Sequence, residues 1–148
     1  MPIRIHYMSD LHLEFAPMNV DLPSGEVLIL AGDILVSRYL DPSRGDEKSK
    51  ILRERFLSFF NDAVSKFDLV LYVTGNHEPY GTSIQLSDTL IAEHLPKEMV
   101  WLKDDWIDYN GVRFVGGTLW CGLHDPFNSY AVQEGLNDFR AIKWENER

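Results

Sequence analysis

Paired cysteines, long apolar runs and an excess of basic residues are all missing from this sequence, and each absence excludes a class of protein. The 148 residues include a single cysteine, Cys121, which excludes an internal disulfide framework and zinc-ribbon sites. We expect Cys121 to be a small buried apolar residue. No run of about eighteen apolar residues is present, and Met1 to Arg4 lead into a strand-like segment without the apolar region of a signal peptide. The sequence therefore predicts a cytoplasmic protein that spans no membrane.

Basic residues are few, because 14 lysines and arginines stand against 23 aspartates and glutamates, for a formal net charge of -9. Binding to duplex nucleic acid depends largely on neutralised phosphates, so we expect no general nucleic-acid binding. With 45% hydrophobic and 25% charged residues, the composition suits one domain over residues 1–148. The basic residues that do cluster are interleaved with glutamates and predict a solvated helix face: Lys48, Lys50, Arg53 and Arg55.

Strand and helix signals alternate along the chain and predict an α/β fold. Three short apolar runs look like buried parallel strands: Ile3 to Ser9, Val27 to Ala31 and Leu69 to Thr74. Two segments have apolar residues at helical spacing: a helix from an N-cap at Asp46 to about Phe67, and a second helix from Ser83 to His94.

The remaining segments predict loops and short strands. The polar stretch from Ser37 to Gly45 reads as a surface loop, and Asn110-Gly111 as a tight hairpin turn. We expect short strands at Met99 to Leu102, Trp106 to Tyr109 and Val112 to Trp120. We also expect the tryptophans to pack in the interior: Trp101, Trp106, Trp120 and Trp144.

Three polar motifs each follow one of the apolar runs. They are Asp10-Leu11-His12, Gly32-Asp33 and Gly75-Asn76-His77-Glu78. The carboxyl ends of parallel strands meet at one edge of a sheet, where ligands bind, so the three motifs should converge. Residues i and i+2 of a strand point the same way, so Asp10 and His12 could address one cation. Oxygen and imidazole ligands suit Mn²⁺, Fe or Zn²⁺.

The order and content of these motifs closely resemble the calcineurin-like metallophosphoesterase family. The resemblance implies two divalent metal ions (Mn, Fe or Zn), with Asp10, His12 and Asp33 on the first and Asp33 and Asn76 on the second. It implies that His77 is catalytic and contacts the phosphate or the leaving oxygen. The implied reaction is hydrolysis of a phosphate ester by attack of a metal-bound hydroxide.

The family fold is a four-layer α/β/β/α sandwich, and this chain carries the motifs of its amino-terminal half. The family's later lone His and Gly-His-x-His are missing. One sheet would then have a bare inner face, so we expect self-association or a carboxy-terminal partner segment. Two alternatives stay open: a catalytically incomplete metal-binding or interaction module, and a nuclease of the same superfamily. The chain lacks the Asp-Arg-Gly of protein phosphatases, which leaves phosphomonoesters, nucleotide phosphodiesters and nucleic-acid ends as substrates.

The other candidate residues have simpler interpretations. Glu78 is expected to support the turn that contains it. His6 and His94 are expected to be structural, because one lies within a strand and the other at a helix end. His124 follows a glycine in a loop that could lie on the site side, so it is a candidate for contact with substrate or metal.

Overall fold

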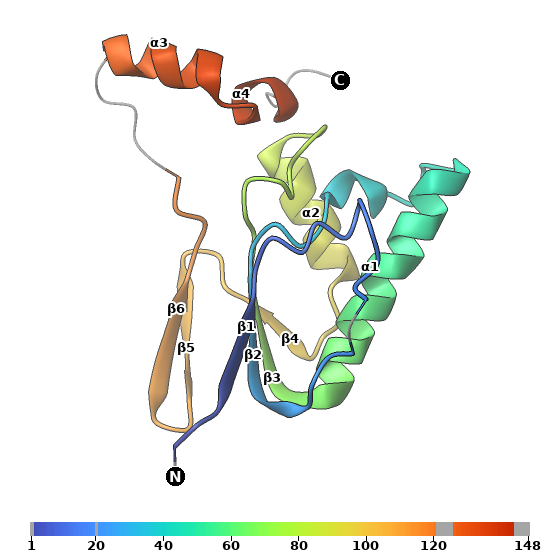
Figure 1. The fold of residues 1–148 in the computed structure, drawn as a ribbon, viewed down its shortest axis with the longest axis vertical. Coiled ribbons are helices and arrows are strands. Elements are labelled where there is room, and N and C mark those ends of the chain that lie inside the picture. Colours follow the sequence, from blue (N-terminus) through green and yellow to red (C-terminus); the bar gives the residue numbers. More distant parts are fainter. Residues whose placement is uncertain (1, 20, 121–125, 144–148) are drawn as a thin grey trace.

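A four-stranded parallel sheet forms the centre of the molecule, with two helices on one face (Figure 1). The computed structural model describes residues 2–19, 21–120 and 126–143. The strands pair in the order β1-β2-β3-β4 and every pairing is parallel, which confirms the predicted α/β class. Their ends differ from the predicted ends by at most two residues. They are β1 (Ile5–Met8), β2 (Gly25–Ala31), β3 (Phe67–Val73) and β4 (Met99–Trp101).

Both long helices begin with a capping side chain, of which Asp46 was predicted as a cap, while the second helix was predicted to begin near Ser83. In α1 (Glu47–Lys66) the side chain of Asp46 accepts a hydrogen bond from Ser49 N. In α2 (Ile84–His94) the side chain of Ser83 accepts one from Leu86 N. Each cap satisfies a backbone donor that the first helical turn leaves free. Residues three and four apart on α1 are buried against the sheet, as their spacing predicts: Leu52, Phe56, Phe59, Phe60 and Ala63.

The opposite face of the sheet is covered by a hairpin of β5 (Asp105–Tyr109) and β6 (Val112–Gly116). Both turn residues are left-handed, with φ of 48° at Asn110 and 78° at Gly111, which is the geometry of a tight two-residue hairpin. A second, smaller core lies beneath the hairpin: Val27, Leu69, Leu71, Leu102 and Phe114.

The expectation of a bare inner face is therefore wrong for the centre of the sheet, because the chain itself supplies a cover. On the edge strand β1, however, Ile5 and Tyr7 lie outside that cover and are 44% and 80% exposed. Self-association, or a carboxy-terminal partner segment, stays a prediction.

Several local predictions are corrected. Ser37–Tyr39 forms a short 3₁₀ helix (η1) that is largely buried, because the hydroxyl and backbone N of Ser37 both donate to Glu78 O. Strand β6 ends at Gly116 rather than Trp120, since its partner β5 has no residue before Asp105 left to pair.

Side-chain placements also differ from expectation. Trp106 and Trp120 are 53% and 49% exposed, so neither is an interior residue. Arg53 and Arg55 are not simply solvated, because they donate to backbone carbonyls of neighbouring loops. Cys121, His124 and Trp144 lie outside the described residues.

Two helices after the hairpin were not predicted, α3 (Pro126–Gly135) and α4 (Asp138–Ala141). The second returns to the loop after β3, where Gly81 N donates to Ala141 O at 2.7 Å and Lys143 N donates to Thr82 O at 2.9 Å. Among the helices of the described residues, none is long and apolar enough to cross a bilayer.

Candidate metal centre

The three polar motifs meet beyond the carboxyl ends of β1, β2 and β3. Backbone hydrogen bonds join the first two, since Asp10 N donates to Gly32 O and His12 N donates to Asp33 O, each at 3.0 Å. The motifs are not extensions of the strands, as β1 ends at Met8. Asp10, His12 and Asp33 instead adopt left-handed backbone conformations, with φ of 55°, 45° and 54°. The convergence was predicted, but the extended geometry assumed for Asp10 and His12 is wrong.

Glycine is required where the second and third motifs touch. A Cβ on Gly75 would lie 2.1 Å from Asp33 Oδ1, and one on Gly32 would lie 2.9 Å from the Gly75 backbone. Any side chain at Gly75 would therefore displace the carboxylate of Asp33. That carboxylate is also held by the turn itself, because His77 N donates to Asp33 Oδ1 at 2.9 Å.

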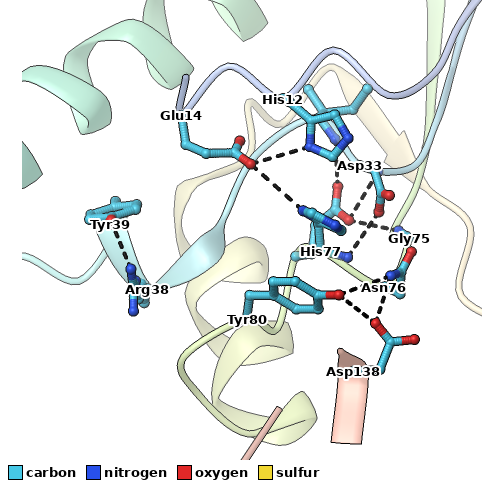
Figure 2. A network of polar contacts seen from close by, with 12 residues as sticks. His12, Glu14, Asp33, Arg38, Tyr39, Gly75, Asn76, His77, Tyr80 and Asp138 are labelled. Carbon is cyan, nitrogen blue, oxygen red and sulfur yellow. Dashed lines mark hydrogen bonds and ion pairs between the residues drawn. The ribbon is translucent and has the colours of Figure 1, made fainter. Parts of the chain in front are cut away.

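Three ligand-type side chains gather at this junction, as Figure 2 shows. His12, Asp33 and His77 each offer an atom within 4.8 Å of the others, and all three are partly exposed. The two imidazole rings are 4.4 Å apart between centroids. Within the described parts of the chain, the carboxylate of Asp10 is outside this group. The structure thus brings together two of the four predicted ligands and the predicted catalytic histidine.

Glu14 stands behind both histidines and was not among the predicted site residues. Its Oε1 lies 3.2 Å from His12 Nδ1 and 3.8 Å from His77 Nδ1, and its side chain is 8% exposed. A carboxylate on Nδ1 leaves Nε2 of His12 as the free lone pair, the arrangement usual for a metal-ligating histidine. The other oxygen, Oε2, is buried and has no hydrogen-bond partner among the described residues. No sequence signal singled out Glu14, because the alternation of Asp10, His12 and Glu14 would require a strand, and β1 ends at Met8.

Glu78 ties the second and third motifs together from below. It is fully buried, and its carboxylate accepts hydrogen bonds from the backbone N of Asp33, Ile34 and Gly75 at 2.8–3.1 Å. The Tyr72 hydroxyl donates to the same carboxylate at 2.9 Å. Burial raises the pKa of Glu78 to about 7, against the effect of these hydrogen bonds. The prediction that Glu78 supports the turn is confirmed by these contacts.

Asn76 is held by a residue from the far end of the chain. Its Nδ2 donates to Asp138 Oδ1 at 2.8 Å, and the Tyr80 hydroxyl donates to the same oxygen at 2.5 Å. The Tyr80 ring in turn stacks on His77, with centroids 4.1 Å apart. Burial raises the pKa of Tyr80, and the hydrogen bond to Asp138 adds to the effect.

The other histidines in the described residues have structural contacts. His94 Nδ1 is 2.8 Å from Leu90 O one turn earlier in α2, and His6 packs edge-on against Phe67. Both contacts agree with the structural interpretation given to these residues.

The chain is similar to a viral protein and matches no family model. No family model matches the chain. The chain is similar to an uncharacterized protein, L509, of Acanthamoeba polyphaga mimivirus, with 23% identity over 164 residues and 94% of this chain covered. The alignment spans 51% of the viral protein, so this chain spans about half the length of the relative that it matches.

Proposed function

We propose that this chain carries the metal-binding part of a calcineurin-like metallophosphoesterase, which hydrolyses a phosphate ester at a centre of two divalent metal ions. One observation carries the proposal: motif loops far apart in sequence converge so that His12, Asp33 and His77 offer ligand atoms within 4.8 Å. The corresponding fold would be a four-layer α/β/β/α sandwich. In it, the sheet β1–β4 is the first sheet and the hairpin β5–β6 belongs to the second.

The donor atoms suit Mn²⁺, Fe or Zn²⁺. The imidazole of His12 has its Nδ1 next to Glu14, so that Nε2 is free to ligate. Asp33 accepts one backbone hydrogen bond through Oδ1, and Asn76 adds a neutral amide oxygen. Asp10, His12 and Asp33 would hold one ion, and Asp33 and Asn76 the other. No thiolate takes part in this donor set, as expected for hard and borderline metals.

The side chains around the proposed metal ions then divide into those that contact substrate and those that position other residues. Bound divalent ions would supply a Lewis acid and lower the pKa of a coordinated water. The His77 ring is fixed between Tyr80 and His12, where its free edge can donate a hydrogen bond to a phosphate oxygen or a proton to the leaving oxygen. Glu78 and Glu14 touch no substrate in this scheme and keep the contacting residues in position.

Calorimetric titration with Mn²⁺, together with turnover of an aryl phosphate, tests the proposal. We expect metal binding that Asp33→Asn weakens strongly, because this carboxylate is proposed to serve both ions. A matched control is Asp62→Asn, a carboxylate on α1 that pairs only with Lys66 among the described residues. Unchanged binding in Asp33→Asn would remove the two-metal centre.

The turnover measurement separates the alternatives. Metal binding without hydrolysis of any phosphate ester would favour a metal-binding or interaction module. Hydrolysis confined to nucleic acid would favour a nuclease, which the net charge of -9 argues against.

A further inference from the structure

We propose that Asp138 is a positioning residue that orients the side-chain amide of Asn76, and that the segment 126–143 is therefore part of the metal centre. The metal-binding aspect of this inference rests on the proposed function. The orientation of the amide does not, because it follows from hydrogen bonds within the chain.

The contact joins residues 62 positions apart in the sequence. Asp138 Oδ1 accepts hydrogen bonds from Asn76 Nδ2 at 2.8 Å and from the Tyr80 hydroxyl at 2.5 Å. The Tyr80 hydroxyl also lies 3.4 Å from Asn76 Nδ2, so the three groups form a closed set (Figure 2). Asp138 is partly buried in this arrangement.

The chemistry of a carboxylate determines which way the amide faces. An ionised carboxylate only accepts hydrogen bonds, whereas an amide has a donating nitrogen and an accepting oxygen on opposite branches. Asn76 must therefore turn its nitrogen to Asp138, and its oxygen faces away from Asp138 (Figure 2). A metal ligand must present this oxygen. Without Asp138, rotation about the last side-chain bond could present the nitrogen instead.

Backbone hydrogen bonds bring Asp138 to this position. Gly81 N donates to Ala141 O, and Lys143 N donates to Thr82 O, so the end of α4 is tied to the loop that follows the Gly75–Glu78 turn. Asp138 is the first residue of α4 and lies one helical turn from this attachment. Because Tyr80 both donates to Asp138 and stacks on His77, one carboxylate holds Asn76 and the ring that supports His77.

Mn²⁺ titration of the 148-residue chain tests the inference. Loss of a residue that orients a ligand typically lowers metal affinity by about 10–100-fold, and we expect this of Asp138→Ala. The Asp138→Asn variant should keep most of the wild-type affinity, because its amide oxygen can still accept a hydrogen bond from Asn76 Nδ2. The control is Glu134→Ala, an exposed carboxylate of the same segment whose described ion pair is with Arg140.

A double-mutant cycle distinguishes orientation of Asn76 from a general structural role. In the Asn76→Ala background, Asp138→Ala should have no further effect on Mn²⁺ affinity, since there is no amide left to orient. An equal loss in both backgrounds would overturn the inference. So would wild-type affinity in Asp138→Ala.

A measurement without metal keeps the inference separate from the proposed function. In NMR spectra of the metal-free protein, the two side-chain NH₂ protons of Asn76 should exchange slowly and resonate apart from those of exposed asparagines. Asp138→Ala should abolish both features. If the wild type bound no Mn²⁺ yet showed these signals, the proposed function would fail and the orientation would stand; ordinary Asn76 signals in the wild type would overturn the orientation itself.

Discussion

The Gly75–Glu78 turn has an inward side, which is Glu78, and an outward side, which is Asn76 and His77. The two sides differ in burial and in the groups that they contact. Inward, Glu78 is fully buried and accepts three backbone hydrogen bonds and one from a tyrosine hydroxyl. Outward, Asn76 and His77 are partly exposed, and their side chains contact the side chains of Asp138, Tyr80 and His12.

This difference separates residues that stabilise the site, such as Glu78, from residues proposed to bind metal or substrate, such as Asn76 and His77. Replacing a buried residue with several hydrogen bonds leaves several groups unsatisfied, which destabilises the fold. Replacing a partly exposed residue at the rim removes a ligand or a proton donor and leaves the fold nearly intact. We therefore expect inward changes to alter stability and outward changes to alter binding and turnover.

The largest effect is expected on the outward side. His77→Ala should lower turnover of an aryl phosphate by about 10²–10⁴-fold, the loss typical of one acid or electrostatic group. Metal content, measured by elemental analysis, and the unfolding midpoint should stay near wild type. His94→Ala is the control, because His94 lies at the end of α2 and its ring nitrogen contacts Leu90 O of the same helix. Loss of metal along with activity would instead make His77 a ligand, as its place beside His12 and Asp33 allows.

On the inward side, the effect should depend on pH. The pKa of Glu78 is about 7 in the folded chain, raised from an ordinary value of 4.5 by burial. Between these values the unfolded chain releases a proton that the folded chain keeps, so the free energy of unfolding falls as pH rises. This stabilising contribution is complete below about pH 4.5 and is lost through pH 7, by about 3 kcal/mol.

Glu78→Gln removes this titration and serves as the reference. Urea unfolding of both proteins in a chelating buffer should give a wild-type minus variant difference that declines from pH 4.5 to 7. A difference that is flat with pH would mean that Glu78 is ionised throughout, and that the hydrogen bonds to it outweigh burial.

A smaller effect is expected for Glu14, which shares properties of both sides. Its side chain is 8% exposed, its polar contacts among the described residues are to the two histidines, and Oε2 has no partner there. Glu14→Gln should weaken Mn²⁺ binding by about tenfold, as for other carboxylates behind a ligating histidine. The unfolding midpoint should change little, because glutamine keeps the shape of the side chain and Oε2 has no hydrogen bond to lose. Glu26→Gln, at a partly exposed carboxylate that pairs with Arg4 and lies outside the metal centre, is the control.

The smallest effect is expected from association of chains, which would matter only if one chain alone does not form the whole metal centre. If chains associate through the exposed residues of β1, Mn²⁺ affinity and turnover per chain should rise with protein concentration. Sedimentation velocity over the same range would show whether dimers form. Constant values for a monomer up to tens of micromolar would show that the outward side is complete within one chain.

The sequence was sufficient for the parts of the site that depend on local patterns. Apolar runs ending in polar motifs located the junction of the three loops. Apolar residues at helical spacing located both long helices, and Asp46 marked the start of the first. These features depend on residues close together in the sequence, so they can be predicted from the sequence alone.

The parts that could not be predicted depend on tertiary contacts. Asp138 reaches Asn76 across 62 positions, and α4 has only four residues, too few for a periodic signal. The left-handed conformations of Asp10 and His12 also have only a weak local signature, since aspartate and histidine adopt them more often than most residues but far less often than glycine. Glu14 looked like one more acidic residue in an acidic chain.

The left-handed residues of the motifs imply a trade-off between thermal stability and metal binding. A non-glycine residue held at positive φ carries strain of about 1 kcal/mol or more, which glycine would relieve. Asp10, His12 and Asp33 all occupy such positions, with φ between 45° and 55°. Selection for variants of higher thermal stability should therefore recover glycine in place of Asp10, because the side chain of Asp10 makes no described contact that glycine would lose. Such variants would resist heat better than the parent protein while losing the side chain proposed to hold the first ion.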